Sequence, residues 1–537
     1  MSMIPLLRRQ YFVLNCKEGR LTAWSKVLHT KPLVSSALIK TQREIVTMNK
    51  FGVVCIVMGA LALFSKVSVA QEFDCSAEVT ATGGLIEVAA SSGGDDTENL
   101  QCALNAAADG GYKDVYLSSS EYSVGGIEVN NFKGSLRGRS ADLTTVNITD
   151  GALSCEKGAA LRFNAGAPSV ERMSLNISEP CSTPGGSASL IGFYTSPETC
   201  TTNRTIFGSV DRVIIEGAGS AGLDFVTGIT IDASPECFPE DGDTPLPVAN
   251  KVLGSLTVNR NQIRDLDIGI FSALSGAGQM DITFNVVQNE PAGTPDIVAM
   301  ERLGIAISIV DANQNTTIYR NEISYNDVQY SGALDGLFGT TGILVGSTAA
   351  AENINKTTFN KNTFTDGGVH AEGYALLSAQ QGKSVNHEVV ITGNTLTGNE
   401  ANTSGAGLAV LDTSSGLISG NTFKGDALSW VTLDSGDVAD GGLGATVSGW
   451  AIVANAFAAS TATTDITLGS KTQDIIVGRS QGQPVVSDAG SNDVLESAAS
   501  ARTFLGNSPI SVGSEAFFER QLETIQGRGA PLRKLGR

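Results

Sequence analysis

The chain has 537 residues, including 61 glycines, and its 55 Asp and Glu against 36 Lys and Arg give a formal net charge of -19. So acidic a polypeptide repels nucleic acids and anionic membrane surfaces. The composition therefore excludes nucleic acid as a partner and favours a soluble, exported protein that attracts cations.

Residues 48–70 have the features of a secretory signal peptide. Lys50 precedes an apolar run, and the small residues Ser68 and Ala70 provide a cleavage site before Gln71. The apolar run has about fourteen residues, fewer than the roughly twenty that a membrane-spanning helix needs. We expect a signal peptide that starts at Met48, with an uncleaved N-terminal anchor as the alternative.

Residues 1–47 carry eight Lys and Arg against two Glu and show no patterned core. We interpret them as a leader upstream of the true start, not as part of the mature protein. A cytoplasmic tail ahead of a membrane anchor is the alternative. Without residues 1–70 the chain has 26 Lys and Arg against 53 Asp and Glu, a net charge of -27.

Residues 95–111 carry the clearest helix signal of the mature chain. Asp95 or Asp96 can cap the first turn, apolar residues follow at helical spacing, and two glycines end the segment. Short alternating strands follow, broken by Gly and Ser. A helix directly before the first strands can cap a solenoid, whose first coil would otherwise expose its core.

One short phrase returns seven times between residues 253 and 457, as in LTVNRNQI, VVITGNTL and GLISGNTF. Each copy has alternating apolar residues, an asparagine, one small or polar residue and another apolar residue, which predicts a strand, a bend and a strand. The copies lie 24 to 41 residues apart, a spacing typical of a solenoid. Their asparagines are Asn261, Asn285, Asn321, Asn362, Asn394, Asn421 and Asn455.

The helix QCALNAAADGG, the strands DVYLSSSEYSV and IEV, and the phrases GNTLTGN and GNTFKGD together resemble the pectin-lyase-like superfamily. The resemblance implies an all-β fold, a single-stranded right-handed parallel β-helix with an N-terminal capping helix and a short C-terminal helix. It implies an architecture and no particular activity, since the superfamily includes lyases, hydrolases, epimerases, tailspikes and adhesins. The predicted organisation is an N-terminal cap at 71–111, a parallel β-helix at 112–480 and a C-terminal cap and tail at 481–537.

In such a fold, equivalent residues of successive coils stack about 4.8 Å apart. An asparagine at each bend can then bond its neighbours above and below and satisfy buried turn amides. We therefore predict an internal asparagine ladder. Asparagines that contact a ligand are the alternative.

The mature chain contains six cysteines, and an even number in an exported protein predicts disulfides. Six cysteines allow fifteen pairings. Because neighbours along a solenoid are also neighbours in space, we favour Cys75–Cys102, Cys155–Cys181 and Cys200–Cys237. The absence of a C-x-x-C motif and the presence of only two mature histidines argue against a zinc site.

A Gly-led apolar strand follows each asparagine phrase, and its alternation predicts which side chains point inward. The predicted inward set is Ile268, Ile270, Ile305, Ile307, Ile343, Val345, Tyr374, Leu376, Leu408, Val410, Leu428 and Trp430. The outward set, which is mostly small and apolar, includes Gly269, Phe271, Ala306, Ser308, Leu344, Gly346, Ala375, Leu377, Ala409, Leu411 and Ser429.

Charged residues gather at one place early in the repeats, which we call the rim. The rim comprises Asp224, Arg264, Asp265, Asp267 and Arg302. Carboxylates and arginines on adjacent coils are the groups that acid–base catalysis, sugar binding or calcium binding requires. A solvent-exposed row of salt bridges is the alternative. No cofactor is otherwise indicated, and calcium is the only candidate cation.

Signatures of β-helix hydrolases, epimerases and pectate lyases, such as NTD, DPHD and RxPxxR, do not occur on the predicted strands. Two functions stay open. The first is an adhesin-like, non-catalytic protein, secreted to the periplasm, the cell surface or the medium, that binds polysaccharide. The second is a polysaccharide lyase, epimerase or hydrolase that acts in a groove along the β-helix.

Overall fold

The structure is a computed structural model. It describes residues 75–91, 94–110, 114–149, 157–177, 188–194, 204–217, 226–232, 252–266, 268–273, 279–289, 305–310, 315–325, 341–348, 355–365, 369–374, 385–398, 407–435 and 444–494. The predicted leader, signal peptide and C-terminal helix lie outside these residues.

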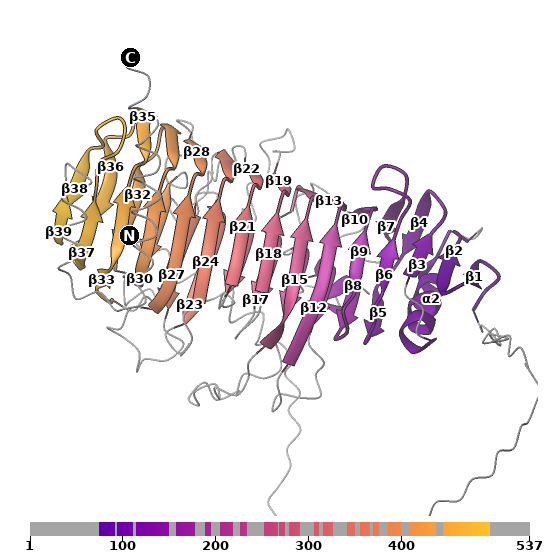
Figure 1. Cartoon of the computed structure of the whole chain (residues 1–537). Coiled ribbons are helices and arrows are strands. Elements are labelled where there is room, and N and C mark those ends of the chain that lie inside the picture. The colour runs from indigo at the N-terminus through magenta and orange to yellow at the C-terminus, as the bar shows by residue number, and fades with distance from the viewer. Residues whose placement is uncertain are drawn as a thin grey trace, which may run out of the picture. The chain divides into compact units, whose positions relative to one another are not determined.

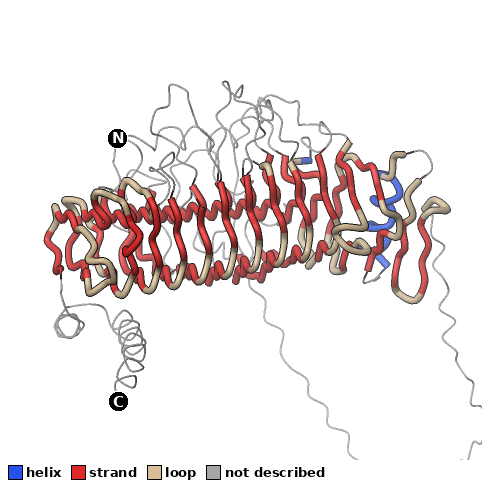
Figure 2. The backbone as a smooth tube through the Cα atoms, turned by 90° about the horizontal axis from the view of Figure 1, so that it is seen from above, coloured by secondary structure: helices blue, strands red, loops and turns tan. Residues whose placement is uncertain are grey.

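The strands form three sheets, named A, B and C, and the chain visits them in that order once per coil (Figure 1). Equivalent strands of successive coils pair in parallel, for example β12 with β15 and β15 with β18. Figure 2 shows the strands of successive coils as a series of parallel rungs. This topology is a parallel β-helix, as the sequence predicts.

Sheet A has sixteen strands. They are β1 (Val79–Thr82), β2 (Leu85–Val88), β3 (Asp114–Leu117), β6 (Ser135–Arg137), β9 (Ser169–Glu171), β12 (Arg204–Asp211), β15 (Val252–Asn259), β18 (Gln279–Thr283), β21 (Asn315–Tyr319), β24 (Asn355–Asn360), β27 (Val385–Thr392), β30 (Thr413–Ser419), β33 (Val447–Ser448), β34 (Trp450–Val453), β37 (Thr472–Val477) and β39 (Ser491–Val494).

Sheet B has eleven strands. They are β4 (Glu121–Val124), β7 (Thr145–Ile148), β10 (Ser174–Ile177), β13 (Ile214–Glu216), β16 (Gln262–Arg264), β19 (Val286–Asn289), β22 (Glu322–Tyr325), β25 (Thr363–Thr365), β28 (Thr395–Gly398), β31 (Thr422–Gly425) and β35 (Ala456–Ser460).

Sheet C has twelve strands. They are β5 (Ile127–Asn130), β8 (Ala159–Asn164), β11 (Ala188–Tyr194), β14 (Val226–Asp232), β17 (Ile268–Ala273), β20 (Ile305–Val310), β23 (Thr341–Thr348), β26 (Val369–Tyr374), β29 (Leu408–Leu411), β32 (Ser429–Asp434), β36 (Thr464–Leu468) and β38 (Val486–Asp488).

The asparagine ladder is confirmed at all seven positions, each at most 2% exposed, at the bend between sheets A and B. Asn321 shows the pattern. Its Nδ2 donates to the carbonyl of Ile282 in the preceding coil at 2.9 Å and to Oδ1 of Asn362 in the next coil at 3.0 Å. Its Oδ1 accepts from the backbone N and the Nδ2 of Asn285 at 2.9 and 3.0 Å. Each side-chain amide therefore joins three coils.

The ladder ends in different residues at its two ends. Towards the N-terminus, Val213 and Met173 hold the equivalent position and are fully buried, and the backbone N of Val213 donates to Oδ1 of Asn261 at 2.9 Å. Towards the C-terminus, Oγ of Ser480 accepts from the backbone N of Asn455 at 3.3 Å. The earliest coils are thus held at this bend by apolar packing, which the asparagine phrase does not reveal.

The core of the early coils contains a stack of aromatic rings. Phe132, Phe163 and Phe193 are almost fully buried, and the centroids of consecutive rings lie 6.1 and 5.9 Å apart. Phe423 packs on Phe457 at 4.7 Å and on Trp430 at 5.4 Å in the later coils. Stacking of like side chains follows from the parallel register, which places equivalent residues one above the other.

The predicted helix is confirmed as α2 (Thr97–Gly110). The carbonyl of Asp96 accepts the first helical bond, from Leu100, and the buried carboxylate of Asp96 accepts from the backbone N of Ser91 and Ser123. The Asp95 carboxylate accepts from the backbone N of Thr97, and hydrogen bonds with Thr97 lower the pKa of Asp95. The apolar face of α2, with Leu100 and Leu104 fully buried, packs against β2, β3 and β5.

The predicted disulfide Cys75–Cys102 is confirmed and joins the segment before β1 to α2. The other four cysteines of the mature chain lie outside the described residues, so the pairs Cys155–Cys181 and Cys200–Cys237 stay predictions.

Several predicted orientations on sheet C are wrong. Leu428 is 74% exposed, because β32 begins one residue later and places Val431 and Leu433 beside Leu408 and Val410 of β29. Ala306, predicted to face outward, is fully buried next to Ile307. Strict alternation fails there because the register joins Ile305 to Ile268 and Ile307 to Ile270, with no pair between them. Ile268 itself is half-buried.

The strand predicted from Gly373 onwards also differs. β26 starts at Val369, which is buried and pairs with Leu408, and ends at Tyr374. A shift of register changes which residues share a face, and neither hydrophobicity nor alternation within this short segment fixes the register.

We expect Asn394→Leu to lower the free energy of unfolding by about 2 kcal/mol or more, because buried partners in two neighbouring coils lose their hydrogen bonds to its side chain. Asn147→Leu is the matched control, since Asn147 faces outward on β7 and makes one exposed bond to Glu121. Its effect should stay within about 0.5 kcal/mol. Equal unfolding midpoints in urea for the two variants would contradict the structural role of the ladder.

We expect the double substitution Cys75→Ser, Cys102→Ser to lower the free energy of unfolding by about 3 kcal/mol, because the bond closes a loop with a sequence separation of 27. Urea unfolding of the oxidised parent and the variant measures the difference. Peptide mapping without reduction should recover a Cys75–Cys102 cross-linked peptide, and free thiols at both positions would refute the pairing.

Candidate functional site

Sheet C carries two rows of residues in register, one row two positions further along the strands than the other. The first row is Glu128, Arg162, Gly192, Thr230, Phe271, Ser308, Leu344, His370, Ala409 and Thr432. The second row is Asn130, Asn164, Tyr194, Asp232, Ala273, Val310, Gly346, Glu372, Leu411 and Asp434. Successive members are about 4.8 Å apart, so an extended ligand along a row meets one residue per coil.

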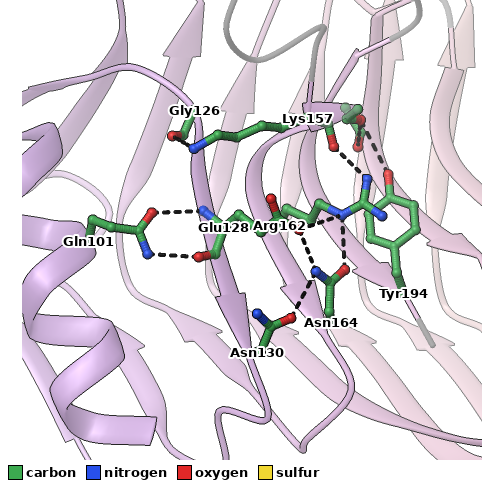
Figure 3. A network of polar contacts seen from close by, with 10 residues as sticks. Gln101, Gly126, Glu128, Asn130, Lys157, Arg162, Asn164 and Tyr194 are labelled. Atoms are coloured by element: carbon green, nitrogen blue, oxygen red, sulfur yellow. Dashed lines mark hydrogen bonds and ion pairs between the residues drawn. The ribbon is translucent and has the colours of Figure 1, made fainter. Parts of the chain in front are cut away.

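A polar cluster occupies the N-terminal end of these rows (Figure 3). Arg162 lies at its centre: Nε donates to Oδ1 of Asn164 at 2.9 Å, and Nη1 donates to the carbonyl of Lys157 at 2.6 Å. The guanidinium lies over the ring of Tyr194, 4.1 Å from its centroid, and Nε is 3.6 Å from Oε1 of Glu128. Four neighbouring groups therefore fix the orientation of Arg162.

Residues on adjacent coils complete the cluster. Asn164 is buried, and its Nδ2 donates to Oε1 of Glu128 at 2.6 Å and to Oδ1 of Asn130 at 3.1 Å. Gln101 of α2 exchanges two hydrogen bonds with the backbone of Glu128, at 2.7 and 3.0 Å. The cluster thus joins α2 to β5, β8 and β11, and Figure 3 shows it extending from the helix across these strands.

The cluster combines one carboxylate, Glu128, with one guanidinium, Arg162. A glycosidase needs two carboxyl groups on either side of the scissile bond, and Glu128 is the only carboxylate among the residues of this cluster that the structure describes. Arg162 has a partly exposed side chain, and its described hydrogen bonds use Nε and Nη1. Its Nη2 is therefore available to an oxygen of a ligand, and a guanidinium is well suited to a carboxylate.

The sequence does not single out this cluster. A signal for it exists in the segment AALRFN, where a charged Arg162 sits between Leu161 and Phe163, which are buried in β8. Asn164 lies in the same segment, but the other partners of Arg162, which are Glu128, Lys157 and Tyr194, lie outside it, so the segment by itself cannot identify them.

The rows extend to Arg162 and Thr230 on strands that precede those for which the sequence predicts a small, apolar outward face. Arg162, Thr230 and Phe271 are half-buried members of the first row. Further along, β26 places His370 and Glu372 two residues apart in the two rows, in register with Leu344 and Gly346 of β23. The misplaced start of this strand is the reason that sequence reasoning overlooked both residues.

The structure describes two of the five rim residues. Arg264 ends β16 of sheet B, where Nη2 donates to Oε1 of Gln262 at 2.8 Å and Nη1 is 4.0 Å from Oε1 of Glu216 in the preceding coil. Asp265 follows in the left-handed region at φ 55°, and its backbone N donates to the carbonyl of Gln288. Asp224, Asp267 and Arg302 lie outside the described residues, so the rim as a site stays a prediction.

No group of three or more His, Cys, Asp or Glu within the described residues is arranged to hold a metal ion. Calcium binding therefore stays a prediction. In the part of the chain that the structure describes, no helix is long and apolar enough to cross a membrane.

The sequence matches no protein-family model and no curated protein. Among solved structures, the A-module of the mannuronan C-5 epimerase AlgE6 from Azotobacter vinelandii is 13% identical, with a TM-score of 0.39 over 75% of this chain and 96% of that chain. The catalytic unit of a GH87 alpha-1,3-glucanase from Streptomyces thermodiastaticus is 14% identical, with a TM-score of 0.36 over 79% of this chain and 71% of that chain. The Dettilon tailspike protein is 14% identical, with a TM-score of 0.40 over 77% of this chain and 69% of that chain.

At these identities the likeness concerns the fold alone. The predicted parallel β-helix is confirmed by the parallel pairing of this chain's own strands, and the resemblance to the pectin-lyase-like superfamily stays a prediction. The strand order and register of this chain carry the fold assignment, and the structures found add nothing on its chemistry.

We expect Arg162→Gln to lower the free energy of unfolding by about 1 to 2 kcal/mol, because the Lys157 carbonyl and Asn164 lose a charged donor. Arg212→Gln is the control, since Arg212 has an exposed ion pair with Asp211 at 3.5 Å that is worth under about 1 kcal/mol. Urea unfolding of both variants tests this. An Arg162 variant as stable as the control would show that the cluster does not hold the strands together.

Proposed function

We propose that the chain is a secreted β-helix protein that binds an extracellular or cell-surface polysaccharide along the outer face of sheet C, in an adhesin-like and non-catalytic role. The single observation that carries the proposal is the continuous register of the two rows over ten consecutive strands of sheet C. Extended glycans repeat along one direction, and so do the rows.

The row residues have the chemistry that sugars require. The half-buried aromatic ring of Phe271 offers an apolar face, while Thr230 and Arg162 offer hydroxyl and guanidinium groups that bond sugar oxygens. The polar cluster fixes the side chains at one end of the rows before any ligand arrives, which reduces the entropy lost on binding.

Secretion is part of the proposal. Residues 48–70 would direct export as a signal peptide, and the disulfide Cys75–Cys102 supports an oxidising compartment, where such bonds persist. In the same proposal α2 caps the first coil, because its buried apolar face covers the edges of β2, β3 and β5.

A polysaccharide lyase or epimerase is the second candidate. The observation that favours it is the position of His370 and Glu372 in the rows, because a histidine is a common general base and uronate chemistry requires removal of a proton. In this alternative the rim residues Asp224, Arg264, Asp265, Asp267 and Arg302 would bind the substrate carboxylate or a cation.

Binding is tested by screening the purified mature protein against neutral and uronate polysaccharides and then comparing two variants. Phe271→Ala should weaken binding of the polysaccharide found by about tenfold, a typical effect of losing one aromatic contact. Phe207→Ala is the matched control, since Phe207 is 40% exposed on β12 of sheet A, away from the rows. Equal losses of affinity in the two variants would refute sheet C as the binding face.

Catalysis is tested in the same screen by measuring unsaturated products and new reducing ends. If cleavage occurs, His370→Ala, Asp267→Asn and Arg302→Ala separate the two catalytic hypotheses. If His370→Ala alone abolishes cleavage, the catalytic residues lie in the rows. If Asp267→Asn or Arg302→Ala abolishes cleavage, they lie in the rim. Binding without cleavage by any form supports the non-catalytic role.

A further inference from the structure

The bend between sheets A and B carries a row of large exposed side chains, directly before the asparagine ladder. On six consecutive coils this position holds Arg172, Arg212, Arg260, Phe284, Arg320 and Lys361, which we call the ridge. Backbone hydrogen bonds establish the alignment: the N of each ridge residue donates to the carbonyl of the residue that precedes the next one, as from Arg260 to Thr283 and from Phe284 to Tyr319. This bend lies at the upper edge of Figure 1, where the strands of sheet A end and the strands of sheet B begin.

Every ridge residue has a left-handed backbone, with φ between 53° and 58°. That conformation is unfavourable for residues with a Cβ and favours Gly or Asn. The next two coils do use glycine at this position, Gly393 and Gly420, both at φ 66°. Since the fold accepts glycine here, the bend itself does not explain five basic residues and one phenylalanine in a strained conformation. Strained residues that are kept in this way often mark functional positions.

The ridge is basic within a strongly acidic chain. All six side chains are exposed. Arg212 pairs with Asp211 at 3.5 Å, whereas the described residues include no carboxylate within 4 Å of the cationic groups of Arg172, Arg260, Arg320 or Lys361. Such cations attract an anionic partner, because no carboxylate of the described residues is in contact with them.

The strand position before the ridge is acidic at Glu171 and Asp211, but from Arg260 onwards it holds one aromatic ring, Tyr319, and the neutral polar residues Asn259, Thr283 and Asn360. Tyr319 packs edge-on against Phe284, with centroids 5.6 Å apart. The guanidinium of Arg320 lies 5.0 Å from the Tyr319 centroid and 5.7 Å from the Phe284 centroid, and Nζ of Lys361 lies 5.7 Å from the Tyr319 centroid. These contacts hold the cations above apolar ring surfaces instead of leaving them fully mobile.

We propose that the ridge from Arg260 to Lys361 binds a linear acidic polysaccharide that runs along the stack of coils, with about one sugar for each coil. The coil spacing of about 4.8 Å is close to the length of one pyranose unit in an extended chain. Three of the four coils then bring a cation to a sugar carboxylate, and the rings of Phe284 and Tyr319 meet the apolar faces of the sugars. The ridge lies at a corner that sheet C does not form, so this is a second binding site, beyond the one proposed above.

The geometry favours a polyuronate over a nucleic acid. Single-stranded nucleic acids bind through aromatic platforms that stack successive bases. The ridge and the strand position before it offer two rings, Phe284 and Tyr319, which lie edge-on to each other and present no such series of parallel platforms.

The test uses the mature protein and the triple variant Arg260→Asn, Arg320→Asn, Lys361→Asn. Asparagine tolerates the left-handed backbone better than Arg or Lys does, so the variant should fold with unchanged or higher stability. Affinity for polygalacturonate should fall roughly tenfold, as expected for three lost exposed charge contacts, and binding by the parent should weaken as salt is added.

A control variant carries the same change in net charge. Lys133→Asn, Lys424→Asn, Lys471→Asn removes three exposed lysines away from the ridge, and its affinity for polygalacturonate should stay within about twofold of the parent. An equal loss in both variants would overturn the proposal, as would unchanged binding by the ridge variant.

The experiments can refute each of the two proposed binding sites independently of the other. Weakened binding in the ridge variant, with Phe271→Ala unaffected, supports the ridge and refutes sheet C as the site for that polymer. A parent that binds a neutral polysaccharide but not polygalacturonate refutes the ridge and leaves the sheet C proposal intact. Tighter binding of single-stranded DNA than of polygalacturonate at the ridge also refutes the acidic polysaccharide as its partner.

Discussion

The stack of seven buried carboxamides at the bend between sheets A and B is the interaction on which the arrangement of coils depends. A bend turns backbone groups away from the strand ladder, and buried amides without partners are costly. A carboxamide both donates and accepts, so one residue type at one position can bond the coil before it and the coil after it. The bonds of Asn321, which reach Ile282, Asn285 and Asn362, illustrate how each member holds three coils in register.

This bend is short and constant, and the other two connections of each coil absorb the variation in length. The ladder asparagines lie 24 to 41 residues apart, although the strand, bend and strand around each one hardly change in length. Parallel pairing on sheets A and B nevertheless fixes the register of sheet C. The two rows on sheet C and the ridge beside the ladder are therefore consequences of one constraint, since any residue repeated at an equivalent position becomes a line of side chains parallel to the stack of coils.

The sheet C rows and the ridge differ in how firmly their side chains are held. In the sheet C rows, Arg162 is fixed by hydrogen bonds to Lys157 and Asn164 and by the ring of Tyr194. On the ridge, the side chain of Arg320 contacts the rings of Phe284 and Tyr319 and stays exposed. A preorganised, partly buried cluster suits recognition of particular sugar groups, whereas exposed cations suit long-range attraction of a charged polymer.

The sequence by itself determined the parallel β-helix, the ladder asparagines and α2, because each leaves a local or repeated pattern, and it favoured the Cys75–Cys102 pair that the structure confirms. Alternation within strands and an asparagine at every bend can be recognised without knowing what lies above or below. Only the tertiary structure decided which residues share a line. Leu428 is exposed and Val369 is buried because pairing with neighbouring strands sets the register, and a short apolar segment fits more than one register. The same holds for Arg162 with Tyr194 and for the ridge, whose members are separated in the sequence by connections of variable length and come together only when the coils stack.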